Sequence, residues 1–119
     1  MDTLDCYFTT ISPWAYLGMR RLRHITTQAG MPVRYLPTEF GRILASVKIK
    51  PLGQRPMPLQ VNRMQELRRW REYLDIPLTL EPAYFPTDPN LSSRMIAVAG
   101  VEKLPVATPA IVLVLLALT

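Results

Sequence analysis

The hydrophobic and polar positions near the N-terminus change their period twice, which predicts a strand, a helix and a second strand. An apolar stretch from Leu4 predicts a short strand followed by a three-residue loop. A helix is expected from about 13 to 29, closed by Gly30 at the position where glycine is favoured. Its expected buried face carries Trp14, Leu17, Leu22, Ile25 and Ala29. Alternation over 33–36 predicts the second strand, so the three elements form a βαβ unit with parallel strands.

The middle of the chain is less regular and then becomes clearly helical. Segment 38–58 contains glycines and prolines, which predicts a long loop with one helical turn near 40–46. A helix is expected at about 60–74, with apolar residues spaced by three and four positions. This stripe consists of Val61, Met64, Leu67, Trp70 and Leu74. Trp70 is therefore expected in the core, and the arginines between the stripe residues are expected on a solvated face.

The last part of the chain combines an extended loop, a short helix and an apolar tail. The prolines of 78–87 predict an extended loop, after which Asp88-Pro89 caps a helix at about 90–99 that Gly100 closes. The tail 108–119 holds an uncharged run of about ten residues, half of the roughly 20 that a membrane-spanning helix needs. Thr108–Val114 is compatible with a strand, but we expect a truncated or altered end instead.

Composition and charge restrict the classes of partner. The chain has 119 residues, enough for one domain, and its net charge of +5 favours anionic partners. Cys6 is the only cysteine, so no internal disulfide can form, and we expect a reducing compartment, the cytoplasm. No signal peptide is expected, because Asp2 and Asp5 interrupt any apolar run. The basic residues lack interleaved aromatic side chains, so neither nucleic acid nor a membrane is the expected partner.

Several catalytic classes are excluded by the residues present. One histidine and one cysteine cannot make a structural zinc site, so no metal is expected. A serine–histidine–aspartate triad would need His24, but His24 lies roughly 18 Å along the helix that Ser12 begins. The chain also has no glycine-rich phosphate loop.

The Ser12-Pro13 pair at the start of the first helix is the strongest candidate for chemistry. Ser12 is the expected N-cap and Pro13 the first helical residue, at the end where free N–H groups favour negative charge. Such a pair also caps many helices that carry no chemistry. Thioredoxin-like folds place a Cys-Pro-x-Cys frame at this corner, and here the four positions read Ser12-Pro13-Trp14-Ala15. The corner can therefore bind a thiolate but cannot form a disulfide.

A set of short segments follows one order along the chain: Tyr7, Ser12 to Leu17, Gln54-Arg55-Pro56, Leu67 to Trp70, Ile76-Pro77-Leu78, Tyr84-Phe85-Pro86 and Ser93-Arg94. In these segments the chain resembles the 2-hydroxychromene-2-carboxylate isomerase family, within the DsbA-like, kappa-class glutathione transferase group. The resemblance covers about 4–98 and implies an α/β fold. Residues 1–39 would be the N-terminal βαβ part of a thioredoxin-like domain, and 40–119 a partial helical insertion. The sheet would be incomplete, because relatives of this family are longer.

The resemblance also implies an activity and a set of site residues. It implies a glutathione-dependent cis–trans isomerase that interconverts 2-hydroxychromene-2-carboxylate and trans-o-hydroxybenzylidenepyruvate in aromatic catabolism. Ser12 would be catalytic and would hold the glutathione sulfur together with Pro13. The aromatic or chromene carboxylate would be bound by Lys48, Gln54, Arg55 and Tyr84. A kappa-like glutathione transferase or peroxidase and a non-catalytic basic anion-binding fragment are the alternatives, and a homodimer is compatible with each.

Overall fold

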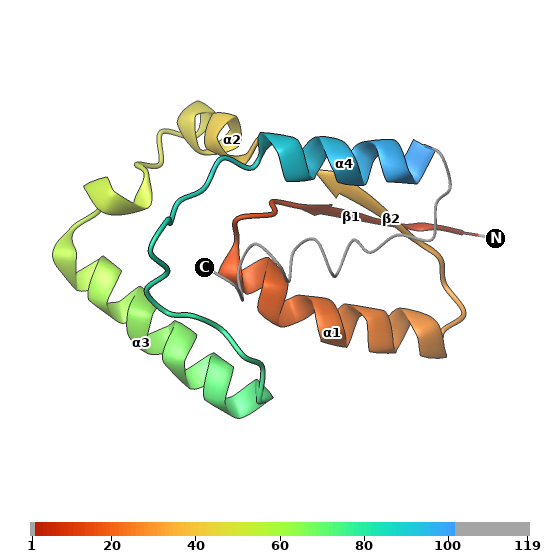
Figure 1. Ribbon diagram of the computed structural model, residues 1–119, viewed down its shortest axis with the longest axis horizontal. Coiled ribbons are helices and arrows are strands. Elements are labelled where there is room, and N and C mark those ends of the chain that lie inside the picture. Colours follow the sequence, from red (N-terminus) through yellow and green to blue (C-terminus); the bar gives the residue numbers. More distant parts are fainter. Residues whose placement is uncertain (1, 102–119) are drawn as a thin grey trace.

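The computed structural model describes residues 2–101, in which two strands and four helices follow one another in the predicted order (Figure 1). The elements are β1 (Leu4–Phe8), α1 (Pro13–Gln28), β2 (Val33–Pro37), α2 (Phe40–Ser46), the 3₁₀ turn η1 (Leu52–Gln54), α3 (Met57–Leu74) and α4 (Asn90–Val101). The predictions for the tail, including the strand at Thr108–Val114, lie outside the described residues. Among the helices of 2–101, none is long and apolar enough to cross a membrane.

The two strands form the predicted parallel pair, which confirms the βαβ unit, and the sheet within residues 2–101 consists of these two strands. Leu4 lies opposite Val33, and the register continues to the last pair of each strand. On the exposed side, Arg34 donates to both carboxylate oxygens of Asp5, at 2.8 Å from Nε and 2.6 Å from Nη2. This hydrogen bonding lowers the pKa of Asp5. The opposite side faces the core, where the rings of Phe8 and Tyr35 meet edge to face at 6.1 Å.

Helix α1 begins and ends as its capping residues predict, but it buries a different face. Gly30 follows it with φ at 62°, the left-handed conformation that only glycine adopts at little cost. Leu17 is buried as expected, together with Tyr16, Met19 and Thr26. The prediction was wrong for Trp14, Ile25 and Ala29, which are exposed. The buried face is set by where α3 and the loop after it contact α1, and the helical period alone does not contain that information.

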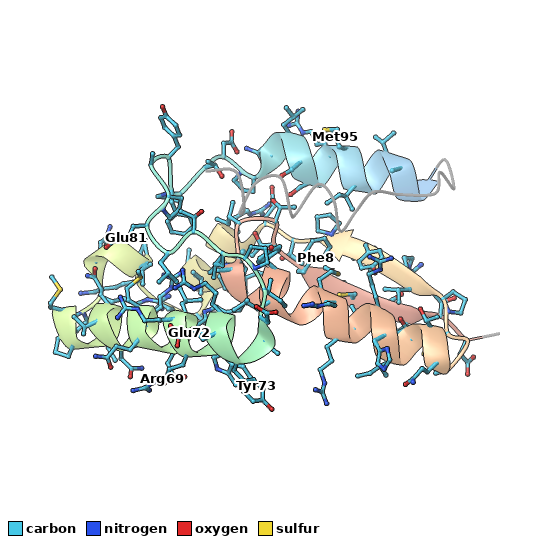
Figure 2. All side chains as sticks on the ribbon, turned by 60° about the horizontal axis from the view of Figure 1, so that its bottom comes forward. Phe8, Arg69, Glu72, Tyr73, Glu81 and Met95 are labelled. Carbon is cyan, nitrogen blue, oxygen red and sulfur yellow. The ribbon has the colours of Figure 1, made fainter. Side chains whose placement is uncertain are left out.

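The segment 38–58 contains α2 where a helical turn was predicted, and it also contains η1, which was not predicted. Helix α3 begins at Met57, a few residues earlier than expected, and Leu67 in its middle is only 2% exposed. Trp70 corrects the prediction: its side chain is 45% exposed and meets Tyr73 edge to face at 5.7 Å. The side chains of Tyr73 and the nearby Arg69 point away from the rest of the molecule (Figure 2). Trp70 therefore lies on the face of α3 that is turned away from the core.

Helix α4 lies beside β2 and is capped as predicted (Figure 1). The backbone N–H of Asn90 donates to Oδ1 of Asp88 at 2.9 Å, so Asp88 stabilises the first turn. Gly100 does not close this helix, which continues to Val101. A single glycine inside a helix is tolerated at a cost of about 1 kcal/mol relative to alanine.

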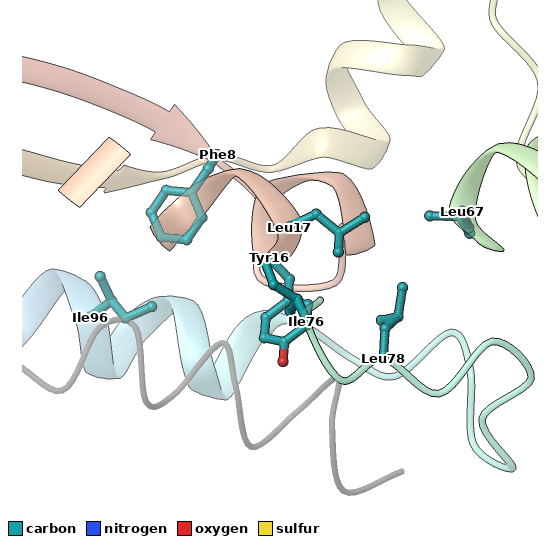
Figure 3. Packing of buried hydrophobic residues seen from close by; sticks show 7 residues of the cluster. All are labelled: Phe8, Tyr16, Leu17, Leu67, Ile76, Leu78 and Ile96. Atoms are coloured by element: carbon teal, nitrogen blue, oxygen red, sulfur yellow. The ribbon is translucent and has the colours of Figure 1, made fainter. Parts of the chain in front are cut away.

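One apolar cluster joins these elements (Figure 3). Its buried members are Phe8, Tyr16, Leu17, Leu67, Ile76, Leu78 and Ile96. The cluster thus combines β1 and α1 with α3, α4 and the loop between them. The division of the chain at residues 39 and 40 stays a prediction, and the cluster contains residues from both sides of it. The first turn of α1 is held in this cluster by Tyr16 and Leu17.

The hydroxyl of Tyr16 links α1 to the loop after α3, and we expect its removal to destabilise the fold. Tyr16 Oη donates to the carbonyl oxygen of Pro77 at 2.6 Å. Tyr16→Phe should lower the free energy of unfolding by about 1 kcal/mol, measured by urea denaturation. The control is Tyr73→Phe, because Tyr73 is 80% exposed and makes no hydrogen bond with residues 2–101. Equal effects of the two substitutions would contradict a role for the Tyr16–Pro77 bond.

Candidate functional site

Ser12 lies at the N-terminus of α1 in the predicted capping geometry. Its backbone is extended, with φ at −83° and ψ at 117°, and its Oγ accepts the N–H of Ala15 at 3.2 Å. This single contact uses the acceptor side of the hydroxyl, so its proton can still be donated. The side chain is partly exposed, whereas Pro13 beside it is buried. Ser12 therefore presents a hydrogen-bond donor at a fixed position on the surface.

The first turn of α1 is electrostatically suited to an anion with a sulfur centre. It contains no acidic residue, and the N–H of Trp14 has no acceptor within the helix. A thiolate placed here meets the Ser12 hydroxyl and the positive end of the helix. The protein's own thiol is not part of this corner: Cys6 lies within β1, and burial raises its pKa. Ala15 occupies the position of the second cysteine of the Cys-Pro-x-Cys frame, so the corner has no thiol of its own.

The loop before Ser12 is held by a buried hydrogen-bond network that sequence reasoning missed. Thr10 is fully buried, and its Oγ1 lies 2.8 Å from Oγ of Ser92 on α4. Ser92 Oγ also donates to the carbonyl oxygen of Pro89 at 3.0 Å, so Thr10 is the donor to Ser92. Next to it, the buried Oγ1 of Thr9 has no partner within residues 2–101. Helix α4 thus fixes the loop that positions Ser12, a contact between residues far apart in sequence.

The residues expected to bind a carboxylate lie in the middle of the chain, away from α1 in sequence. Lys48 follows α2 with φ at 56°, and its side chain is exposed. Gln54 ends η1, and Arg55 is half-buried with its Nε donating to the carbonyl oxygen of Lys50 at 2.9 Å. Tyr84 is 76% exposed on the loop between α3 and α4. Within residues 2–101, no hydrogen bond or ion pair joins any of these side chains to Ser12, so their role stays a prediction.

Arg63 and Phe85 form a contact that the sequence pattern did not reveal. The guanidinium carbon of Arg63 on α3 lies 5.8 Å from the centroid of the Phe85 ring. Arg63 is half-buried, which corrects the prediction that the arginines of this helix all lie on a solvated face. Burial lowers the pKa of Arg63, and the charge of Arg55 lowers it further. An arginine in this position is indistinguishable in sequence from its solvated neighbours on the same helix.

The arrangement of strands, capped helix and helical segment agrees with a family-level match. Residues 3–113 match the DSBA-like thioredoxin domain. The chain belongs to this family. A fold comparison agrees: a solved 2-hydroxychromene-2-carboxylate isomerase superposes on 98% of the chain with a TM-score of 0.66 at 21% sequence identity. At 21% sequence identity, this match shows that the two proteins share a fold.

Curated relatives of the DSBA-like domain carry two names. Glutathione S-transferase kappa 1 of Caenorhabditis elegans is 30% identical over 71% of the chain, and a 2-hydroxychromene-2-carboxylate isomerase of Sphingobium xenophagum is 27% identical over 76%. The matches cover 37% and 47% of these two relatives and 57% of the solved isomerase. The chain thus spans about half the length of the proteins it resembles, or less.

A cavity of about 520 Å³ lies along α1 of the DSBA-like domain, but none of the predicted site residues lines it. Its walls include Met19, Arg20, Arg23 and His24 on α1 and Ile76 after α3. Arg20 contacts the carbonyl oxygens of Leu74 and Asp75 at 3.4 Å, which ties this wall to the end of α3. The cavity is therefore separate from the Ser12 corner and from Arg55.

Proposed function

We propose that this DSBA-like domain binds glutathione and serves a glutathione-dependent cis–trans isomerase of aromatic or chromene carboxylates. The reaction in question interconverts 2-hydroxychromene-2-carboxylate and trans-o-hydroxybenzylidenepyruvate. The observation that carries the proposal is the Ser12 hydroxyl at the open N-terminus of α1, with Ala15 in the place of a second cysteine. The relatives named as isomerases and as a glutathione transferase support the choice of glutathione as the thiol.

The residues of the corner explain how a bound thiol becomes reactive. Ser12 Oγ accepts from Ala15, so its proton can be donated to a sulfur anion, and the N–H of Trp14 is available to the same anion. Both contacts, together with the helix dipole, favour the charged form and lower the pKa of the thiol toward neutrality. Bound glutathione supplies a thiolate that adds to the conjugated substrate, permits rotation about a carbon–carbon bond and leaves again. Pro13 is buried and holds the helix start in place.

The negative charge of the substrate carboxylate requires a basic partner, which residues between β2 and α4 supply. We assign the substrate carboxylate to Arg55, which can bind it with two N–H groups, and place Gln54, Lys48 and Tyr84 around the same molecule. The Nε of Arg55 is held by the Lys50 carbonyl oxygen, which leaves its Nη groups for the ligand.

Glutathione transfer is the second candidate function, because the relative at 30% identity is a kappa-class transferase. Both functions need the same thiolate at Ser12 and differ in the electrophile. Conjugation of 1-chloro-2,4-dinitrobenzene in the absence of isomerisation would favour the transferase. Anion binding that is insensitive to glutathione would instead indicate a basic binding fragment without catalysis.

We expect reduced glutathione at millimolar concentration to raise the unfolding temperature of the chain. Binding to the folded state alone stabilises it by about 2.7 kcal/mol when the ligand is present at 100 times its dissociation constant. S-methylglutathione is the matched control, because it keeps the peptide but cannot form a thiolate, and it should produce a clearly smaller shift. Differential scanning fluorimetry measures both. No shift with either compound would contradict the proposal, and equal shifts would place the contact on the peptide and away from the sulfur.

A further inference from the structure

Arg63 is a half-buried cation that the described structure leaves without an acidic partner. The ion pairs within residues 2–101 join Arg34 to Asp5, Arg42 to Glu39 and Arg69 to Glu66, and none includes Arg63. Glu66, one turn further along α3, is hydrogen-bonded to Arg69 at 3.0 Å. The polar contact of Arg63 in the same part of the chain is Nη1 to the sulfur of Met64 at 4.0 Å, and a thioether is a weak acceptor.

Arg55 lies beside the first turn of α3, the helix that carries Arg63, and two hydrogen bonds hold it there. Arg55 donates from Nε to the Lys50 carbonyl oxygen, and Gln60 of α3 donates from Nε2 to the Arg55 carbonyl oxygen at 2.8 Å. These bonds fix Arg55 against the first turns of α3. Its charge lowers the pKa of Arg63 beyond the effect of burial, so the two cations repel each other. An anion bound by both guanidinium groups would offset this repulsion.

An aromatic ring lies against the guanidinium of Arg63. The Phe85 ring contacts the guanidinium of Arg63 and restricts its orientation. The neighbouring Tyr84 presents an exposed ring on the same loop. A planar ligand with a carboxylate would satisfy the cations and bury apolar surface against such rings. An inorganic anion would use only the charges.

We propose that Arg63, together with Arg55, binds the carboxylate of a small aromatic acid, and that Phe85 orients Arg63 for this contact. Arg63 then determines that the site takes acids and rejects neutral aromatic compounds. The identity of this acid as the isomerase substrate class rests on the proposed function. The binding of aromatic carboxylates at Arg63 does not depend on glutathione or on Ser12.

The test is isothermal titration calorimetry of trans-cinnamate and of its neutral amide, without glutathione, on the full 119-residue chain. Arg63→Gln should raise the dissociation constant for cinnamate about 10-fold or more, the range expected when a charged hydrogen-bond donor is lost. Arg68→Gln is the control, because Arg68 is an exposed arginine on the same helix and makes no ion pair within residues 2–101. Arg63→Lys keeps the charge but not the two-pronged geometry and should fall between the two.

Stability measurements separate loss of binding from loss of the fold. The unfolding temperatures of Arg63→Gln and Arg68→Gln are measured together, and binding is compared at a temperature at which both variants are folded. Cinnamate affinity that is unchanged by Arg63→Gln, equal affinity for the amide, or no binding by the wild type would overturn the inference. Ser12→Ala should bind cinnamate like the wild type. Arg63-dependent binding in a chain that shows no response to glutathione would remove the proposed function and leave this inference standing.

Discussion

Replacing Ser12 with alanine is expected to abolish the rise in unfolding temperature that glutathione produces and to lower isomerase turnover by about 100-fold or more. The substitution removes the hydroxyl donor at the start of α1, and the helix N–H groups alone hold the charged thiol less well. It also removes the acceptor for the Ala15 N–H, so the free energy of unfolding should fall by about 1 kcal/mol without ligand. Thermal shift and turnover are measured on the same preparations.

Two further variants separate the capping role of Ser12 from its role toward sulfur. Ser12→Asp keeps an oxygen that can accept the Ala15 N–H, so the stability without ligand should stay close to that of the wild type. Its negative charge repels a thiolate, so the response to glutathione should still be lost. Ser46→Ala removes an exposed hydroxyl from α2 and should leave the response intact. A normal glutathione response in both Ser12 variants would place the sulfur site elsewhere.

Leu67→Ala should destabilise the fold more than any surface substitution on the same helix. Leu67 is 2% exposed and packs in the cluster that joins α3 to α1 (Figure 3). Truncating a buried leucine costs about 2–5 kcal/mol through lost burial and the cavity left behind. That is a large share of the 5–15 kcal/mol typical of a whole domain, so the midpoint of urea denaturation should fall clearly. Circular dichroism with urea denaturation measures the loss.

Leu59→Ala supplies the matched control for Leu67→Ala. Leu59 lies on α3 as well but is 56% exposed, and alanine is at least as good a helix former as leucine. Its effect should stay within about 0.5 kcal/mol. If both substitutions cost the same, α3 does not contribute to the cluster through Leu67, and the contact between α3 and α1 would have to be reconsidered.

Local signals in the sequence predicted the elements that position Ser12. The cap at Ser12, the proline after it and Gly30 define both ends of α1, because each depends only on neighbouring backbone groups. The alternation over 33–36 predicted β2, and Asp88 predicted the start of α4. The core position of Leu67 followed from the spacing of the apolar stripe. The caps were predictable because each depends on hydrogen bonds within one helical turn. The strand and the stripe of Leu67 were predictable because the spacing of their apolar residues matches the period of a strand and of a helix.

The exposure of the tryptophans could not be predicted in the same way. Trp14 and Trp70 lie on apolar stripes, yet both are exposed, since the stripe of a helix is wider than the surface its neighbours cover. The spacing of apolar residues along a helix shows which positions could be buried. Burial itself depends on where a second element comes into contact.

The sequence by itself determined the βαβ start of this DSBA-like domain and the capped helix end at Ser12. Tertiary structure alone decided which distant residues support that end and which residues meet beside Arg55. Thr10 reaches Ser92, and Arg63 reaches Phe85, across long stretches of chain. Neither pair carries a local signal, because the residues around a buried threonine or a half-buried arginine follow the same pattern as those around a solvated one. Packing of the helices against one cluster brings these groups together, and desolvation then gives them properties that their solvated neighbours lack.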